Sequence, residues 1–316
     1  MYRKILVPLD GSHFSELALP RALGLAQRWD ADVELVTVAN PGGVRRLPEP
    51  TELIGDESRD RAKGEARDYL SSVESRVREA GFEGELGRTV IPSGNVSSSL
   101  VRHLRDVGAD FAVMTTHGRG PLERGWLGSS ADGFIRRSPV PVLLVRPREE
   151  DGEEIPESGT APVEVHPTGF RKVLFPLDGS PGGERLLELA SPLLDEEARA
   201  LLLRVITPPV PGTYPYLPHL VQDTQDREAQ KEAGLEYLQG LVDRTAAAEV
   251  DARVVSAAQP AVAILRAVDE EGVDLVAMST AGRGGVARLL LGSVADKVIR
   301  GAPVPVLVFR EPEEKK

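Results

Sequence analysis

The sequence contains no cysteine, so disulfide bonds, thiolate metal sites and a cysteine nucleophile are all excluded. Aromatic residues are scarce, at 4%, and the core must therefore be built from leucine, valine, isoleucine and alanine. No stretch approaches the roughly 20 consecutive apolar residues of a membrane span, and residues 1–8 lack the apolar region of a signal peptide. We therefore expect a cytoplasmic protein that does not bind a membrane.

Positive charge is also in short supply. Lysine and arginine number 38 against 49 aspartates and glutamates, which gives a formal net charge of −11. Non-specific binding to nucleic acid needs clustered cations, so we expect no nucleic-acid partner. A small anion is still compatible with this charge, because backbone amides can hold a phosphate. The five histidines show no metal-ligand spacing, and no resident metal site is predicted.

What the chain does have is an internal repeat. The segment RKILVPLDGS at 3–12 returns as RKVLFPLDGS at 171–180. Glycines 118 and 128 and Pro139 return at 282, 292 and 303, each 164 residues later. Retained spacing of this kind indicates two copies of one domain of ordinary size. We predict a first domain at 1–147, an acidic flexible linker at 148–168 and a second domain at 169–312.

Within each copy, short apolar segments alternate with amphipathic ones, which is typical of a parallel sheet with helices on both faces. Strands are predicted in the first copy at 5–9, 33–38, 86–91, 111–115 and 140–145. The corresponding strands of the second copy are predicted at 173–177, 200–206, 252–256, 275–279 and 304–309. The helix after the first strand has Ser12 or Ser15 as its candidate N-cap, and Pro20 either kinks it or marks its true start.

A glycine-rich turn follows the fourth strand of each copy. It reads Thr115-x-x-Gly118, nine residues, Gly128-Ser129 in the first copy, and Ser279-x-x-Gly282, nine residues, Gly292-Ser293 in the second. Glycines allow close approach to a ligand, turn amides form an anion-binding concavity, and a helix N-terminus adds free N–H groups. Together these features suit a polyphosphate. The alternative is that the glycines only make a turn and the serines only cap a helix.

This pattern resembles the ATP-binding motif of universal stress proteins. The PLDGS segments and the closing PVPVL strands resemble the same family, and the likeness covers nearly the whole chain apart from the linker and loops. The resemblance implies two tandem doubly wound, Rossmann-like α/β domains, each with a five-stranded parallel sheet. It also implies ATP, with or without Mg²⁺, at the carboxyl ends of the strands. Pairing through the closing strands is implied as well, inside the chain as a pseudo-dimer or between chains as a homodimer.

The resemblance further implies a set of binding residues. Aspartates 10 and 178 would lie beside the adenine or ribose, valines 38 and 205 would line the adenine pocket, and the glycines and serines would cradle phosphates. In the first copy the predicted residues are Pro8, Asp10, Val38, Thr115, Gly118, Arg119, Gly128, Ser129 and Ser130. In the second copy they are Pro176, Asp178, Val205, Ser279, Gly282, Arg283, Gly292, Ser293 and Val294. For the aspartates the alternative is a turn residue that caps the next helix, and for the arginines a solvated surface position.

The two copies differ at several of these positions. Thr115 and Ser279 replace the first glycine of the family motif. A glycine that often precedes the third helix in the family matches Gly94, whereas Gln259 and Pro260 stand at the corresponding place in the second copy. The two sites are therefore expected to differ in affinity.

The sequence thus predicts an ATP-dependent regulatory or stress-response protein with an unknown protein partner and no catalytic residue. Two alternatives stay open. One is a slow ATPase or phosphotransferase that uses the same pocket, for which no base or metal-bound nucleophile is evident. The other is a structural interaction module that binds no nucleotide.

Overall fold

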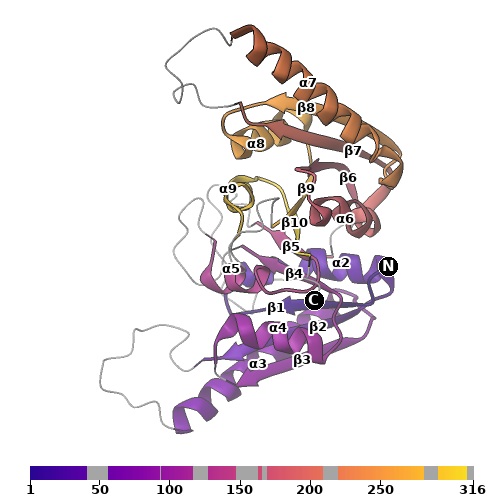
Figure 1. Cartoon of the computed structure of the whole chain (residues 1–316). Helices are drawn as coiled ribbons and strands as arrows, with labels where there is room; N and C mark the ends of the chain where they lie inside the picture. The colour runs from indigo at the N-terminus through magenta and orange to yellow at the C-terminus, as the bar shows by residue number, and fades with distance from the viewer. Residues whose placement is uncertain are drawn as a thin grey trace, which may run out of the picture. The chain divides into compact units, whose positions relative to one another are not determined.

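The computed structural model describes residues 1–40, 56–92, 94–116, 127–146, 163–165, 169–208, 220–280 and 291–311. The chain divides into two compact units, Met1–Thr168 and Gly169–Lys316, and each is described by itself. In both units helices flank a sheet (Figure 1). No helix within the described ranges is both long enough and apolar enough to cross a bilayer. Most of the predicted linker lies outside the described residues.

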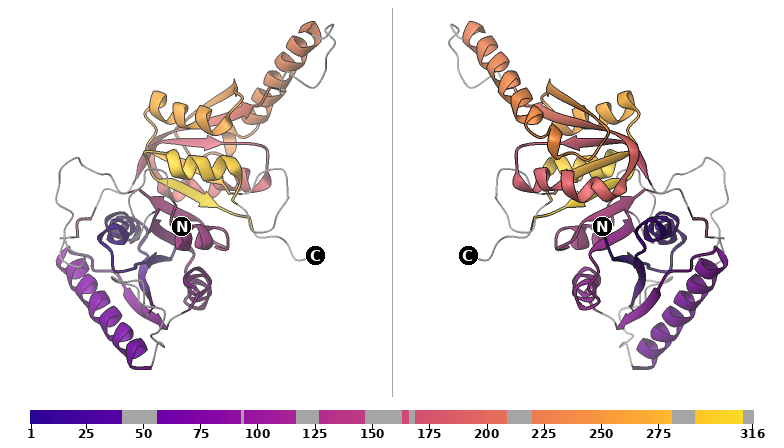
Figure 2. Two further views of the ribbon diagram at one scale, coloured as in Figure 1. Left: turned by 90° about the vertical axis from the view of Figure 1, so that its left-hand side faces the viewer. Right: turned by 90° about the vertical axis from the view of Figure 1, so that its right-hand side faces the viewer.

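The first unit alternates strands and helices in the predicted order. Its strands are β1 (Lys4–Pro8), β2 (Asp32–Ala39), β3 (Leu86–Pro92), β4 (Phe111–Thr115) and β5 (Val142–Val145). Its helices are α1 (His13–Glu16), α2 (Leu19–Trp29), α3 (Asp56–Glu79), α4 (Val96–Asp106) and α5 (Ser129–Ile135). The strands are ordered β3-β2-β1-β4-β5 and neighbours run parallel. Helices α2 and α3 cover one face of the sheet, and α4 and α5 cover the other (Figure 2).

The second unit repeats this architecture. Its strands are β6 (Phe170–Pro176), β7 (Leu194–Ile206), β8 (Glu249–Ser256), β9 (Leu275–Ser279) and β10 (Val306–Phe309). Its helices are α6 (Pro181–Ala190), α7 (Leu220–Gln239), α8 (Pro260–Glu271) and α9 (Ser293–Gly301), with short 3-10 turns η1 (Ser191–Leu193) and η2 (Val242–Arg244). The order β8-β7-β6-β9-β10, again parallel, matches that of the first unit. The structure confirms two tandem doubly wound α/β domains.

Element boundaries differ from the prediction where local chemistry intervenes. The closing strands begin at Val142 and Val306 rather than at the predicted Val140 and Val304. Each is preceded by a proline, which has no N–H to donate to a strand ladder. Strand β7 begins at Leu194, before the predicted Ala200, because a register shift in β6 lets Leu194 pair with Phe170.

The segment after β1 resolves the two alternatives for Pro20. Ser12 caps α1, with its Oγ accepting from the Ser15 amide at 3.1 Å. A second helix, α2, starts at Leu19 with Pro20 in its first turn, where the missing N–H costs nothing because first-turn amides have no partner inside the helix. Pro20 therefore marks a helix start and causes no kink.

One buried polar contact distinguishes the cores of the two units. The Glu34 carboxylate in β2 lies 2.9 Å from His103 Nε2 in α4 and accepts from Thr89 Oγ1 at 2.7 Å. Burial alone would raise the pKa of Glu34, but the hydrogen bonds from His103 and Thr89 outweigh it and hold that pKa below its ordinary value. The second unit has Leu201 and Ala267, both buried, at the corresponding positions.

Candidate functional site

The carboxyl ends of adjacent parallel strands bring distant polar residues together in each unit. Strand β6 pairs with β9 through Val173 with Leu275 and Leu174 with Val276. Because the pairing is parallel, the turn that follows β6 lies at the same edge of the sheet as the end of β9. Asp178 and Ser279 are thereby placed on one rim, where ligands of doubly wound sheets bind.

The Asp-Gly-Ser turn after the first strand has the same geometry in both units. Asp10 Oδ1 accepts from the Ser12 amide at 2.9 Å, and Asp178 Oδ1 accepts from the Ser180 amide at 2.9 Å. The intervening glycines have φ of 78° and 81°, in the left-handed region that favours glycine. Both aspartates therefore act as turn residues, as one alternative predicted, but the caps of the next helices are Ser12 and Ser180. In both turns the oxygen that accepts this hydrogen bond is Oδ1, not Oδ2.

A threonine that the sequence analysis missed links three elements after the fourth strand. The Thr280 amide donates to Phe309 O at 3.1 Å, and the Thr280 carbonyl accepts from the Gly292 amide at 2.9 Å. In the first unit Thr116 makes the equivalent bonds, at 3.2 Å to Val145 O and 3.0 Å from the Gly128 amide. These bonds fix the start of α5 and α9 at the end of β4 and β9. Main-chain atoms make these hydrogen bonds, so no residue type in the sequence could have indicated them.

Helices α5 and α9 begin without a side-chain cap. Their N-cap residues are Gly128 and Gly292, whose φ and ψ of −58° and 141°, and −59° and 142°, are nearly identical. Helix α6 differs, because Ser180 Oγ accepts from its Gly183 amide. A glycine has no side-chain oxygen that could accept a hydrogen bond from these amides. The first-turn N–H groups of α5 and α9, at the positive end of the helix dipole, can therefore bind an anion.

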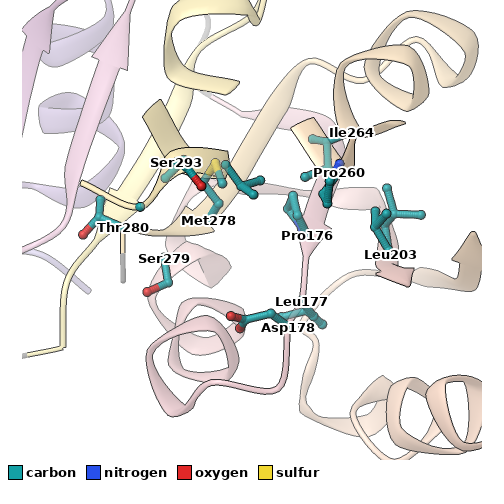
Figure 3. Close-up of a pocket in the computed structure, with 14 residues that line it drawn as sticks. Pro176, Leu177, Asp178, Leu203, Pro260, Ile264, Met278, Ser279, Thr280 and Ser293 are labelled. Atoms are coloured by element: carbon teal, nitrogen blue, oxygen red, sulfur yellow. The ribbon is translucent and has the colours of Figure 1, made fainter. Parts of the chain in front are cut away.

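In the second unit these features line a cavity of about 270 Å³, just below the usual range for small-molecule sites. Figure 3 shows Pro176, Leu203, Pro260 and Ile264 on one side and Met278, Thr280 and Ser293 on the other. Seven of the predicted residues line this cavity, namely Pro176, Asp178, Val205, Ser279, Gly292, Ser293 and Val294. The remaining two, Gly282 and Arg283, lie outside the described residues.

The predicted residues of the first unit occupy the corresponding places. Pro8 and Thr115 end β1 and β4, Val38 is the penultimate residue of β2, and Asp10 lies in the turn after β1. Gly128 caps α5, and Ser129 and Ser130 are exposed in its first turn. The other two, Gly118 and Arg119, lie outside the described residues.

The lining of the cavity is mostly apolar, with polar groups at one end. Among its described lining residues Asp178 is the one charged side chain. The Thr280 hydroxyl is buried, the residue being 3% exposed, and it has no hydrogen-bond partner among the described residues. A buried hydroxyl without a partner costs free energy, so its presence beside a cavity points to a ligand or water that satisfies it. No cluster of three or more histidine, aspartate or glutamate side chains that could hold a metal occurs in the described part of the chain.

Half of the residues that line the cavity could not be predicted from the sequence. The additional lining residues are Leu177, Leu203, Pro260, Ile264, Met278, Thr280 and Ala295. Helix α8 supplies Pro260 and Ile264, and it begins without a side-chain cap, whereas Asn95 caps α4 by accepting from the Ser98 amide at 3.1 Å. The two units therefore differ at the start of α4 and α8. This is the place where Gly94 in the first copy has no counterpart in the second.

Comparison with known proteins identifies relatives of both units. The sequence model described as "Universal stress protein family" matches residues 1–146 and 169–310. A putative universal stress protein of Staphylococcus epidermidis is 29% identical over 160 residues, covering 50% of this chain and 93% of its own length. One from Staphylococcus aureus shows the same identity and coverage.

Solved structures share the tandem fold. A universal stress protein of Archaeoglobus fulgidus has a TM-score of 0.61 at 22% identity, and the match covers 97% of this chain and 96% of that one. A putative universal stress protein of Pseudomonas aeruginosa has a TM-score of 0.61 at 16% identity, covering 98% and 93%. At these identities the likeness concerns the fold alone.

Proposed function

Because the chain belongs to the universal stress protein family, we propose that it is a cytoplasmic regulatory protein of the stress response whose ligand is ATP. ATP acts in this proposal as a switch ligand that changes how the protein interacts with a partner. Each unit would hold one nucleotide at the carboxyl edge of its sheet. Binding rather than turnover is the proposed activity.

The observation that carries this proposal is the pair of uncapped helix N-termini at α5 and α9. In the second unit the start of α9 opens onto the cavity through Gly292, Ser293 and Val294. First-turn amides and the helix dipole stabilise an anion without any basic side chain. A triphosphate at this place would meet amide donors and the Ser293 hydroxyl.

The rest of the cavity suits the nucleoside part of ATP. Pro176, Leu203, Pro260 and Ile264 form an apolar wall against which a purine ring could stack. Asp178 lies at the rim, and a carboxylate there accepts hydrogen bonds from ribose hydroxyls. Mg²⁺ would then arrive with the triphosphate, held by phosphate oxygens and water.

The described lining residues favour binding over catalysis. They include neither an imidazole nor a second carboxylate. Asp178, the single acid, already accepts a hydrogen bond from the Ser180 amide. A general base needs to reach a proton-bearing nucleophile, and nothing in the described lining is placed for that role.

The first prediction is that purified protein binds ATP with at least one site per chain. The apolar wall and the amide donors together should favour ATP over adenosine or inorganic triphosphate, each of which uses half of the site. Isothermal calorimetry with all three probes measures this, and mass spectrometry of the heat-released ligand tests for co-purified nucleotide. Absence of both nucleotide and binding heat would contradict the proposal. Assay of released phosphate in the same samples shows whether the slow-ATPase alternative applies.

A further inference from the structure

A set of three polar residues recurs in each unit, and one of them lies in the helix that follows the Asp-Gly-Ser turn. Its members are a glutamate from the helix that follows the turn, a tyrosine from α3 or α7, and an arginine that lies in α3 in the first unit and in η2 in the second. In the first unit they are Glu16, Tyr69 and Arg76, and in the second Glu184, Tyr237 and Arg244, each separated from its counterpart by the same interval (16 to 184, 69 to 237, 76 to 244). We call each set the Glu–Tyr–Arg cluster.

In the second unit both the tyrosine and the arginine of the cluster donate hydrogen bonds to the glutamate. Tyr237 Oη donates to Glu184 Oε1 at 3.1 Å, and Arg244 Nη1 donates to Glu184 Oε2 at 2.8 Å. The Arg204 guanidinium lies 4.9 Å from the centre of the Tyr237 ring. Burial, with the Glu184 carboxylate, raises the pKa of Tyr237 to about 12, so its hydroxyl stays protonated and acts as a donor.

In the first unit the same cluster is more deeply buried. Arg76 Nη1 lies 3.0 Å from Glu16 Oε2, and the two side chains are only 11% and 5% exposed. Burial raises the pKa of Tyr69, and the Glu16 carboxylate raises it further. The three residue types are thus retained in both units. The hydrogen bond from tyrosine to glutamate is present in the second unit, whereas the buried Tyr69 hydroxyl has no hydrogen-bond partner among the described residues.

The cluster is connected to the candidate site through a short helix. Glu184 lies in the first turn of α6, whose N-cap, Ser180, is bonded to Asp178. Glu16 closes α1, whose N-cap, Ser12, is bonded to Asp10 in the same way. Movement of the glutamate would therefore move the turn that presents the aspartate.

Stability alone does not account for the cluster. The partly exposed Arg244–Glu184 pair gives little net stability, because water screens the two charges. A buried pair such as Arg76–Glu16 also gives little, because desolvation of both charges offsets their attraction. What such a pair does provide is a defined geometry, since hydrogen-bonded charges tolerate few alternative arrangements. A binding site that requires one conformation of the Asp-Gly-Ser turn would bind its ligand more tightly when the turn is restricted to that conformation.

We infer that Tyr237 is a positioning residue for the nucleotide site of the second unit. Its hydroxyl holds Glu184, and through the capped helix α6 holds the Asp-Gly-Ser turn in the conformation that receives the nucleoside. The inference rests on the proposed function for its ligand, but the restraint on the turn belongs to the free protein. Tyr237 itself does not line the cavity.

The test is the full-length variant Tyr237→Phe, which removes the hydroxyl that bonds Glu184 and keeps the ring. We expect the Kd for ATP at one of the two sites to rise about three- to tenfold, which is part of the worth of one hydrogen bond to a charged group. In the ATP-free variant, the amide of Ser180 should exchange with deuterium faster than in the parent, and the amide of Ser12 should exchange at the parent rate. Tyr2→Phe is the matched control, because Tyr2 packs on Trp29 and Phe111 beside the start of β1, at the opposite edge of the sheet.

The outcomes separate this inference from the proposed function. If the parent binds ATP and Tyr237→Phe binds it equally well at both sites, the positioning role is wrong, and a merely structural role would give that result with a lower denaturation midpoint. If the parent binds no ATP, the proposed function fails, and unchanged exchange at Ser180 would then overturn the positioning role independently. Should Tyr237→Phe not fold, Glu184→Gln should weaken the same site, and unchanged affinity there would overturn the role.

Discussion

Replacing Ser129 and Ser293 together by glutamate is expected to abolish ATP binding while leaving the protein folded. Both serines are exposed at the first position of their helices, directly after the capping glycines. A carboxylate there interacts favourably with the helix dipole, so stability should hold or rise by about 0.3–1 kcal/mol per helix. The same carboxylate occupies the amides and repels a triphosphate, and we expect affinity to fall by about 100-fold or more.

Two companion variants make this result specific. Ser129→Ala/Ser293→Ala removes only the hydroxyls, and because the amides stay in place we expect a loss of about two- to fivefold. Ser75→Glu/Ala233→Glu adds the same two charges at exposed positions on α3 and α7, and should leave affinity unchanged. Calorimetry measures affinity and thermal unfolding measures stability. Full ATP binding by the serine-to-glutamate variant would show that these helix starts do not hold the triphosphate.

His103→Ala is expected to cause a large loss of stability in the first unit. The substitution leaves the buried Glu34 carboxylate without its imidazole partner, and removal of one member of a buried pair costs about 3–5 kcal/mol. The double variant Glu34→Leu/His103→Ala copies the second unit, where Leu201 and Ala267 are buried in the same places. We expect the double variant to recover to within about 1–2 kcal/mol of the parent.

Tryptophan fluorescence during denaturation reports this change selectively, because both tryptophans, Trp29 and Trp126, belong to the first unit. Thr89→Val should give an intermediate loss, since it removes one hydrogen bond and leaves His103 in place. The pH dependence follows from the lowered pKa of Glu34. Its contribution is fully present above the unfolded value of about 4.3 and is lost as pH falls through the folded pKa, and the double variant should lack this dependence. Equal destabilisation by the single and double variants would contradict the account.

The sequence predicted those parts of the fold and site whose cause is local. Strand β4 spans Phe111–Thr115 as predicted, because a short apolar segment is followed by a glycine-containing stretch of the sequence. Asp178, Ser279 and Gly292 could be found because each stands at the end of a strand or the start of a helix, where repeat spacing makes it visible. Their contact with a nucleotide stays a prediction.

The residues that were missed depend on long-range packing. Pro260 and Ile264 reach the cavity because α8 lies over β7, which no spacing within α8 indicates. Tyr237 is 53 residues from Glu184 in the chain, so only the comparison of the two copies could have paired them. Glu34 occurs in an otherwise apolar strand, and its partners come from α4 and β3.

The uncapped starts of α5 and α9 have a consequence for how such a protein changes over time. A backbone N–H donor is retained after any point mutation that leaves the helix intact. The side chains around it can therefore change during evolution without loss of the donor. Ser130 and Val294 already occupy the same place in the two helices, and Thr115 and Ser279 the same strand end. Divergent copies should therefore be recognised better by the nine-residue interval between their glycines than by any invariant side chain.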